Sequence, residues 1–283
     1  MAATRDERIA KIRSGCWIRY SSAEAVLKKL EELLLLPKTH RMPNLLLVGE
    51  TNNGKTALVN HFVRRHQPQF GDQDTPSHIP ILVVQAPPVP DEGRLYQAIL
   101  RQLFPPCRPS QRIDLLQREA LRLLQAVDVK ALIIDEIHHV LAGSTLKQRH
   151  FLNVLKYMGN ELQIPLIAVG THDAFNAVQS DPQLANRFEP ATLPRWSMGK
   201  EYLRLLASFE KALPLERAST LVEQTLALKI LSLSEGTIGE IGTLLQRAAL
   251  RAIERGTEQI TSEILDACGY IPPSERRHAA FAT

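Results

Sequence analysis

The sequence lacks several features that define whole classes of protein. Its three cysteines, Cys16, Cys107 and Cys268, are far apart and include no C-x-x-C pair. This spacing excludes a disulfide framework and a cysteine zinc site, so free thiols in a reducing compartment are the simplest interpretation. No apolar run approaches the ~20 residues needed to span a bilayer. The charged start, residues 1–13, has no signal-peptide core. We therefore expect a cytoplasmic protein with no membrane partner.

The sequence also lacks a strong charge of one sign. The formal net charge is +4, which permits a polyanionic partner without requiring one. Hydrophobic residues make up 44% and charged residues 23%, as is ordinary for a globular protein. A length of 283 residues is enough for one large domain and a small one.

What the sequence does contain is a phosphate-binding motif. Residues 49–56 read G-E-T-N-N-G-K-T, which matches G-x-x-x-x-G-K-T. An apolar run, Leu45–Val48, precedes the motif and a helical stretch, Ala57–Arg65, follows it, as the chemistry of the loop requires. Lys55 is then placed for the β- and γ-phosphates of ATP, and the Thr56 hydroxyl for Mg²⁺. The alternative is a glycine-rich turn without a ligand, which this context disfavours. The predicted cofactor-binding residues of the motif are Gly49, Glu50, Thr51, Asn52, Asn53, Gly54, Lys55, Thr56 and Ala57.

A second motif places two carboxylates at the end of a buried strand. Residues 131–136 read A-L-I-I-D-E, and the apolar run predicts a strand that is buried on both faces. Open α/β sheets bind ligands at the carboxyl ends of their strands. We expect Asp135 to hold Mg²⁺ together with Thr56, and Glu136 to orient and polarise the attacking water. The alternative is a solvated acidic turn; the phosphate loop upstream favours the catalytic interpretation.

The chain divides into four parts. Residues 1–43 form a lead-in with an amphipathic helix, and residues 44–195 alternate strands with helices, which predicts a parallel α/β sheet covered on both faces. Residues 196–271 show only helical patterns, and residues 272–283 are expected to be a flexible tail. The expected strands are Leu45–Val48, Ile79–Gln85, Ala131–Asp135, Leu166–Gly170 and Ala191–Leu193, and the expected helices include Glu92–Phe104, Asp114–Ala126, Leu221–Leu233, Ile238–Arg255 and Ser262–Ala267.

These motifs in this order resemble the AAA+ ATPases, P-loop proteins with a five-stranded parallel sheet and a small C-terminal helical lid. The resemblance implies that Thr171, after the strand Leu166–Gly170, contacts the γ-phosphate or the lytic water; its neighbour His172 is more simply solvated. It also implies that Arg187 is an arginine finger, which reaches the γ-phosphate bound by an adjacent subunit. The alternative for Arg187 is a surface arginine in a salt bridge within its own chain.

One position departs from the AAA+ pattern. Many lid helices begin Gly-x-x-Arg, and the arginine senses the nucleotide. Here the segment is Gly236-Thr237-Ile238-Gly239, with Gly239 in the arginine's place near the nucleotide. We therefore expect slow hydrolysis, with ATP acting as an assembly switch. The segment before the first helix often lies against the adenine in this family, which implies that Ile18 or Tyr20 flanks the base; an ordinary core position is the alternative.

Within the AAA+ proteins the chain resembles the TniB family of transposition ATPases, which are related to TnsC and more distantly to MuB. The likeness runs from about Trp17 to Ala267, and its most specific parts are Arg41-Met42-Pro43-Asn44 and the Asn52-Asn53 pair. The resemblance implies a bacterial, ATP-dependent DNA-binding protein that oligomerises as a ring or helical filament on double-stranded target DNA. It implies recruitment of a DDE transposase of the TniA or TnsB type, with a TniQ-like protein as a further partner.

The same resemblance indicates where DNA would bind. In filament-forming relatives, the residues after the second strand and in the following interhelical loop face the DNA. The corresponding residues here are Arg94, Arg108, Ser110, Gln111 and Arg112. Their contacts would reach the phosphate backbone, so binding would be nonspecific in sequence and salt-dependent. A solvated surface charge is the alternative for each arginine.

Other functions remain open from the sequence. An AAA+ ATPase acting on protein, such as a helicase loader or a secretion ATPase, would carry the same motifs. A nucleotide kinase is a weaker alternative, because the Arg187 segment and the helical lid argue against it. ATP-dependent binding to DNA would distinguish these functions from a transposition regulator.

Overall fold

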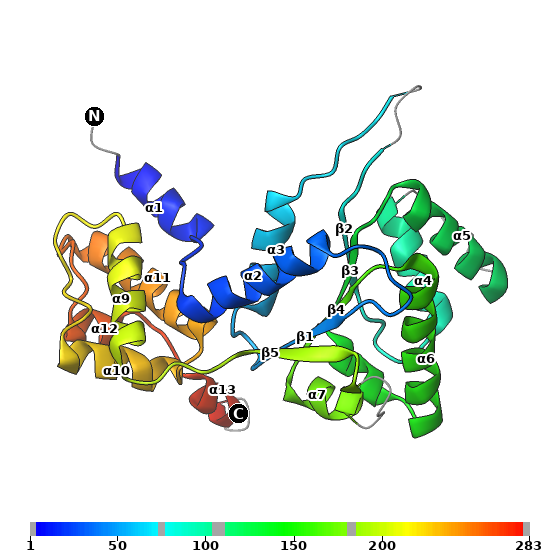
Figure 1. Ribbon diagram of the computed structural model, residues 1–283. Helices are drawn as coiled ribbons and strands as arrows, with labels where there is room; N and C mark the ends of the chain where they lie inside the picture. Colours follow the sequence, from blue (N-terminus) through cyan, green and yellow to red (C-terminus); the bar gives the residue numbers. More distant parts are fainter. Residues whose placement is uncertain (1–3, 73–76, 104–110, 180–184, 280–283) are drawn as a thin grey trace. The chain divides into compact units, whose positions relative to one another are not determined.

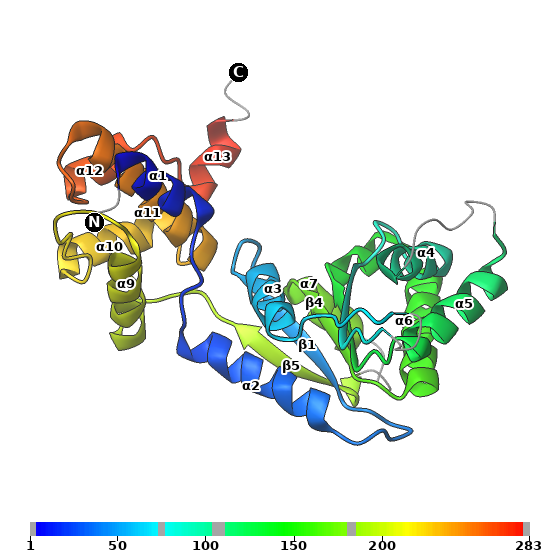
Figure 2. The ribbon, with the colours of Figure 1, turned by 90° about the horizontal axis from the view of Figure 1, so that it is seen from above.

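The computed structural model describes residues 4–72, 77–103, 111–179 and 185–279 (Figures 1 and 2). The chain forms two compact units. We call one the sheet unit, Ala25–Thr51 with Lys55–Leu193, and the other the helical unit, Met1–Glu24 with Asn52–Gly54 and Pro194–Thr283. The middle of the phosphate loop thus belongs to the helical unit, while its two ends belong to the sheet unit.

The sheet unit contains a five-stranded sheet in the order β2-β3-β4-β1-β5, and every strand pair is parallel. The strands are β1 (Asn44–Gly49), β2 (Ile81–Gln85), β3 (Ala131–Asp135), β4 (Leu166–Gly170) and β5 (Phe188–Leu193). All residues of β1, β3 and β4 are buried, which explains their continuous apolar runs. β5 begins three residues before the predicted strand Ala191–Leu193. Glu189 and Pro190 are exposed there, and proline is tolerated because β5 is an edge strand.

Helices cover the sheet on both faces. In Figure 1, α4, α5 and α6 lie together on one side of the strands and α3 lies on the other. Alternate strand residues, including Leu46, Leu82, Leu132 and Leu166, share one hydrophobic core with α4, α5 and α6. The helical elements are α2 (Ser21–Leu35), α3 (Lys55–Arg65), α4 (Glu92–Leu103), α5 (Ile113–Ala126), the 3₁₀ helix η1 (Ile137–Ala142), α6 (Thr145–Leu162) and α7 (His172–Gln179).

The helical unit is built around α11. The buried side chains of α11 recur at helical spacing, at Ile241, Leu244, Leu245, Ala248 and Ala252, and form the centre of a second core. Gly256 closes α11 in the left-handed conformation, as its glycine suggests. The helices are α1 (Arg5–Ser14), α9 (Lys200–Ala212), α10 (Gln224–Ser234), α11 (Ile238–Arg255), α12 (Ser262–Ala267) and α13 (Pro273–Ala279).

The C-terminal segment differs from the flexible tail that the sequence predicts. Pro273 begins the short helix α13, a position at which proline suits a helix. The Ser274 amide donates a hydrogen bond of 2.7 Å to the Glu235 carboxylate, and the Arg276 guanidinium pairs with Glu240. Within the predicted tail, Ser274 and Arg276 therefore have side-chain partners in the helical unit. None of the helices in the described ranges is long and apolar enough to cross a bilayer.

Candidate functional site

The two ends of the phosphate loop, Asp135, Glu136 and Thr171 gather at one edge of the sheet. β4 lies between β1 and β3, and Val48 at the end of β1 is in register with Gly170 at the end of β4. The strands are parallel, so their carboxyl ends meet at the same edge. The phosphate loop, Asp135 and Thr171 stand at the ends of these three neighbouring strands. The sheet therefore brings together residues that lie far apart in the sequence.

Lys55 is buried at this edge. Its side-chain nitrogen donates hydrogen bonds to the main-chain oxygens of Gly49 (2.9 Å) and Glu50 (2.8 Å), so the ammonium lies inside the loop. Burial lowers the pKa of Lys55, while the nearby carboxylates of Glu136, Asp135 and Glu50 act in the opposite direction. A cation held by main-chain oxygens can exchange them for phosphate oxygens, which suits the predicted role.

Thr56 and Asp135 lie together, as a shared metal requires. The Thr56 hydroxyl donates a hydrogen bond of 3.0 Å to Oδ2 of Asp135. The other carboxylate oxygen, Oδ1, accepts the Glu136 amide at 2.9 Å. Mg²⁺ takes few protein ligands, mostly hydroxyl and carboxylate oxygens beside the phosphates, so this pair fits it. The two residues come from α3 and β3, which only the folded sheet brings together.

Glu136 adopts an uncommon backbone conformation. Its φ of 56° and ψ of 38° lie in the left-handed region, which a residue with a side chain enters at a cost. Oε2 of its carboxylate lies 3.0 Å from Nδ1 of His138, at ion-pair distance although not aligned as a hydrogen bond. His138 is therefore a neighbour of the predicted base, which the sequence analysis does not anticipate. Its position two residues after Glu136 is the only signal that the sequence offers.

Thr171 has a buried hydroxyl with no assigned acceptor or donor. Oγ1 of Thr171 makes no hydrogen bond to any of the residues whose positions are described. Buried polar groups in proteins are nearly always paired, so an orphaned hydroxyl beside a phosphate loop suits a bound ligand. This geometry fits the predicted contact to the γ-phosphate or the lytic water.

Arg187 lies far from its own phosphate loop. It directly precedes β5, and Asn44 at the start of β1 pairs with Phe188, so Arg187 is at the amino edge of the strands. The length of β1, Asn44–Gly49, separates the two edges by about 20 Å at ~3.3 Å per residue. An arginine side chain cannot cover this distance. Arg187 is therefore out of reach of the phosphate loop of its own chain.

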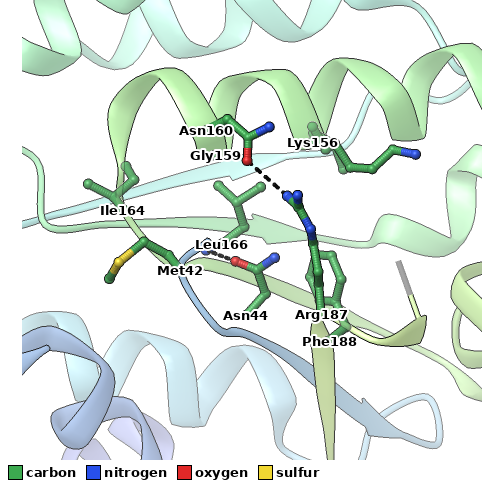
Figure 3. A pocket seen from close by; sticks show the side chains of 10 residues that line it. Met42, Asn44, Lys156, Gly159, Asn160, Ile164, Leu166, Arg187 and Phe188 are labelled. Atoms are coloured by element: carbon green, nitrogen blue, oxygen red, sulfur yellow. Dashed lines mark hydrogen bonds between the residues drawn. The ribbon is translucent and has the colours of Figure 1, made fainter. Parts of the chain in front are cut away.

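The guanidinium of Arg187 is held at the surface by α6. Figure 3 shows it reaching toward Asn160 on this helix, with Lys156 on the same helix nearby. Nη1 of Arg187 donates a hydrogen bond of 2.9 Å to Oδ1 of Asn160. The adjoining cavity has a volume of about 10 Å³, room for one water, so no ligand fits within it. This partner is a neutral amide, whereas the alternative that the sequence allows for Arg187 is a salt bridge.

The tip of the phosphate loop packs on the start of α11. The Gly239 amide donates a hydrogen bond of 3.0 Å to the main-chain oxygen of Asn52. Asn53 is 2% exposed, and its side chain bonds the Ile238 amide (3.3 Å) and the Pro194 oxygen (3.2 Å). Gly54 has a φ of +81°, and a Cβ there would lie 2.9 Å from Ile238. Both Gly54 and Gly239 thus permit a close approach that a side chain would prevent.

Ile18 and Tyr20 lie in the core of the helical unit. Ile18 is 8% exposed, and Tyr20 packs edge-on against Trp196 with ring centroids 5.3 Å apart. Burial raises the pKa of Tyr20 to about 12. Its hydroxyl would be 3.7 Å from a Cβ built on Gly54, so Tyr20 borders the loop tip. The packing agrees with a core role for both residues, and contact with the base stays a prediction.

The predicted DNA-binding residues divide into three groups. Arg94 lines a surface cavity of about 400 Å³ together with Gln97, Arg101 and His139, which we call the α4 cavity. Gln111 and Arg112 bond acidic side chains of α5, Glu119 at 3.2 Å and Asp114 at 3.1 Å. Arg108 and Ser110 lie outside the described residues. The α4 cavity is therefore the best-defined cationic site among these candidates, and the sequence does not identify Arg101 or Gln97.

Comparison with known proteins identifies the family. The bacterial TniB protein family matches residues 8–198, more than half of the chain. The chain belongs to the TniB family. No curated protein matches it closely enough in sequence to count as a relative.

Solved structures identify the fold of this TniB protein. The Aeropyrum pernix ORC1 protein in complex with DNA matches with a TM-score of 0.63 and 15% identity over 89% of this chain. The Aeropyrum pernix ORC2 protein in its ADPNP-ADP complexes matches with a TM-score of 0.62 and 15% identity over 92% of this chain. Cdc6p from Pyrobaculum aerophilum matches with a TM-score of 0.62 and 17% identity over 93% of this chain. The TniB chain spans 65% of the ORC1 chain, just under two thirds, and 70% of each of the other two.

These results confirm two predictions. The fold is that of an AAA+ P-loop ATPase with a five-stranded parallel sheet, and the protein is an AAA+ ATPase of the TniB family. At identities of 15–17% the structural likeness concerns the fold alone.

Proposed function

We propose that this TniB ATPase is an ATP-dependent DNA-binding regulator of DNA transposition. In this proposal it assembles as a ring or helical filament on double-stranded DNA and recruits a DDE transposase of the TniA or TnsB type, with a TniQ-like protein as a further partner. The family membership supports the transposition role. One structural neighbour, the Aeropyrum pernix ORC1 protein, is known in complex with DNA, which agrees with a DNA-binding use of the same fold.

The observation that carries the proposal is the position of Arg187. Its own phosphate loop lies at the other edge of the sheet, so the site of a single chain has no arginine finger from this segment. A second copy can supply the guanidinium, whose fixed charge and fork-like donors match phosphate oxygens. ATP would then stabilise the contact between subunits, because each nucleotide would bind both of them. Arg187 is accessible enough for this role, since its present partner is the surface residue Asn160.

The residues of one site have separate roles in the reaction. Lys55 would bind the β- and γ-phosphates, and Thr56 and Asp135 would hold Mg²⁺, which supplies neutralising charge at the phosphate oxygens. Glu136 would orient the attacking water and accept its proton. Thr171 would donate its orphaned hydroxyl to the γ-phosphate or to this water. Gly239 supplies no cation where many lids have an arginine, so we expect hydrolysis to be slow and regulatory.

Assembly explains how weak DNA contacts become sufficient. In this proposal a single subunit makes few phosphate contacts, among them those of Arg94 and Arg101 in the α4 cavity. Once ATP aligns many subunits, their phosphate contacts act together and the effective concentration of each is high. Binding should then be insensitive to base sequence and strongly dependent on salt. Hydrolysis would loosen the subunit contact and release the DNA.

The proposal is tested by measuring duplex binding with and without a non-hydrolysable ATP analogue. We expect wild-type protein to bind DNA only with the analogue, and Lys55→Ala to fail in both conditions. Arg94→Ala combined with Arg101→Ala should reduce the salt slope by about 2, since each phosphate contact contributes about 1. Arg204→Ala is the matched control, because Arg204 is an exposed arginine of the helical unit paired with Glu201. ATP-dependent assembly of the protein without binding to the duplex would instead favour an AAA+ ATPase acting on protein.

A further inference from the structure

The first turn of α11 contains a buried carboxylate that the nucleotide site does not use. Glu240 is 6% exposed, in the helical unit. A buried carboxylate is costly unless it is paired and hydrogen-bonded. Burial alone would raise its pKa, but hydrogen bonds from Arg276, Tyr270 and Asn52 outweigh this effect, so the pKa of Glu240 is lowered overall. The carboxylate is therefore charged, and its partners determine what it does.

One of these partners is the phosphate loop itself. Nδ2 of Asn52 donates a hydrogen bond of 2.9 Å to Oε1 of Glu240. Asn52 has a φ of 58°, a left-handed conformation that asparagine tolerates but still needs support to hold. The Gly239 amide donates to the main-chain oxygen of the same residue. The backbone and the side chain of Asn52 are thus both fixed by consecutive residues of α11.

The other partners come from the C-terminal segment. Nη1 and Nη2 of Arg276 donate two hydrogen bonds to Glu240, at 3.0 and 2.6 Å, and the Tyr270 hydroxyl donates a third, at 2.6 Å. The Arg276 guanidinium also lies over the Tyr270 ring, 5.3 Å from its centre. Two parallel bonds from one arginine fix the orientation of a carboxylate as well as its charge. The side chain of Arg276 is 44% exposed, so it can leave this position without unfolding the core.

We propose that Glu240, Tyr270 and Arg276 position the phosphate loop through Asn52, so that the C-terminal helix α13 controls the affinity for nucleotide. We call these three residues the Glu240 network. A phosphate loop works by turning main-chain N–H groups toward the phosphates, so its carbonyls must be held away from them. At Asn52 the Gly239 amide fixes the main-chain carbonyl, and the Glu240 carboxylate fixes the side chain. Loss of Arg276 removes two of the hydrogen bonds that orient Glu240, so Glu240 holds Asn52 less firmly and the loop loses part of its ordered conformation.

The Glu240 network also accounts for the glycine at position 239. A Cβ at Gly239 would lie 2.1 Å from Oδ1 of Asn52, so an arginine there would displace the loop. Arg276 of α13 instead places a cation beside this turn of α11, through its hydrogen bonds to Glu240. This inference depends on the nucleotide site of the ATPase and not on DNA or transposition.

The test is equilibrium binding of a fluorescent ATP analogue with Mg²⁺ to the full-length protein in the absence of DNA. We expect Arg276→Ala to weaken binding about tenfold, the effect of losing a hydrogen bond to a charged group. Arg276→Lys keeps the charge without the paired bonds and should restore binding only in part. Arg251→Ala is the matched control, because Arg251 pairs with Glu254 farther along α11 and should leave affinity unchanged.

A double-mutant cycle separates positioning from general destabilisation. If Arg276 acts through Asn52, then Asn52→Ala should remove most of the effect of Arg276→Ala, and the two losses should not add. Additive losses, or wild-type affinity in Arg276→Ala, would overturn the Glu240 network as a positioning device. A wild-type protein that binds no nucleotide would refute the ATPase site as well. A wild type that binds, with Arg276→Ala unchanged, would refute the Glu240 network alone.

Discussion

Replacement of Gly239 by alanine is the most informative single change in this structure. The new Cβ would lie 2.1 Å from Oδ1 of Asn52 and 2.5 Å from its main-chain oxygen. The second contact is with backbone, so rotation of the Asn52 side chain cannot relieve it. Either the phosphate loop or the start of α11 must move. The substitution therefore tests whether the close approach of these segments matters for stability and for nucleotide binding.

Two opposing contributions determine the size of the effect. Alanine favours a helix over glycine by up to about 1 kcal/mol. Overpacking a well-filled site costs about 1–3 kcal/mol. We expect Gly239→Ala to lower the free energy of unfolding by about 1–2 kcal/mol, equivalent to a fall in Tm of about 5 °C in a protein of this size. Because the displaced group belongs to the phosphate loop, affinity for ATP should fall about tenfold as well.

The same helix offers a matched control at Gly242. A Cβ there would meet Phe209 at 3.9 Å, an ordinary contact, so Gly242→Ala should keep the helix-propensity gain of about 0.5–1 kcal/mol. Thermal unfolding and titration with a fluorescent ATP analogue would measure both variants. The reasoning would be refuted if Gly239→Ala matched Gly242→Ala in stability and bound ATP as tightly as the wild type.

Three further predictions concern the catalytic residues. Glu136→Gln should reduce ATP hydrolysis at least ~100-fold while nucleotide binding persists, as expected for loss of a general base, and faster DNA release than the wild type would contradict the assignment. Thr171→Val removes a hydroxyl that makes no hydrogen bond within the described structure, so Tm should stay the same or rise while hydrolysis falls; a large loss of Tm would show a structural role instead. Arg187→Ala should preserve ATP binding by the monomer and impair ATP-dependent assembly, as sedimentation would show. Asn160→Ala breaks the same hydrogen bond but keeps the guanidinium, and should still assemble.

The sheet and much of the helical unit could be predicted from the sequence because their signals are local. Ala131–Asp135 and Leu166–Gly170 are uninterrupted apolar runs, and the structure forms strands over these same residues. The apolar spacing of Ile238–Arg255 and the glycine that follows define α11 without reference to the rest of the chain. The helix α1 is not among the predicted helices, although Thr4 and Glu7 form a capping box, a signal that the sequence does contain.

The Glu240 network could not be predicted because it depends on pairing between distant residues. Asn52 and Glu240 are 188 positions apart, and Glu240 and Arg276 are 36 apart. Charged residues are common in α11 and in α13, and composition does not indicate which carboxylate is buried or which arginine pairs with it. The helix α13 could not be predicted for the same reason, since its partners Glu235 and Glu240 lie far from it in the sequence. Gly239 marks the position at which the sequence departs from the AAA+ pattern, but only the contact with Asn52 explains this departure.

The central claim is that a triphosphate shared between two copies of this chain assembles the protein on DNA. Electron microscopy of purified protein with duplex DNA tests it most directly, with and without a non-hydrolysable ATP analogue. We predict regular rings or filaments on DNA with the analogue, none without it, and none for Arg187→Ala under either condition. Protein that stays monomeric and leaves the duplex bare in the presence of the analogue, or an Arg187→Ala variant that assembles as the wild type does, would contradict the account.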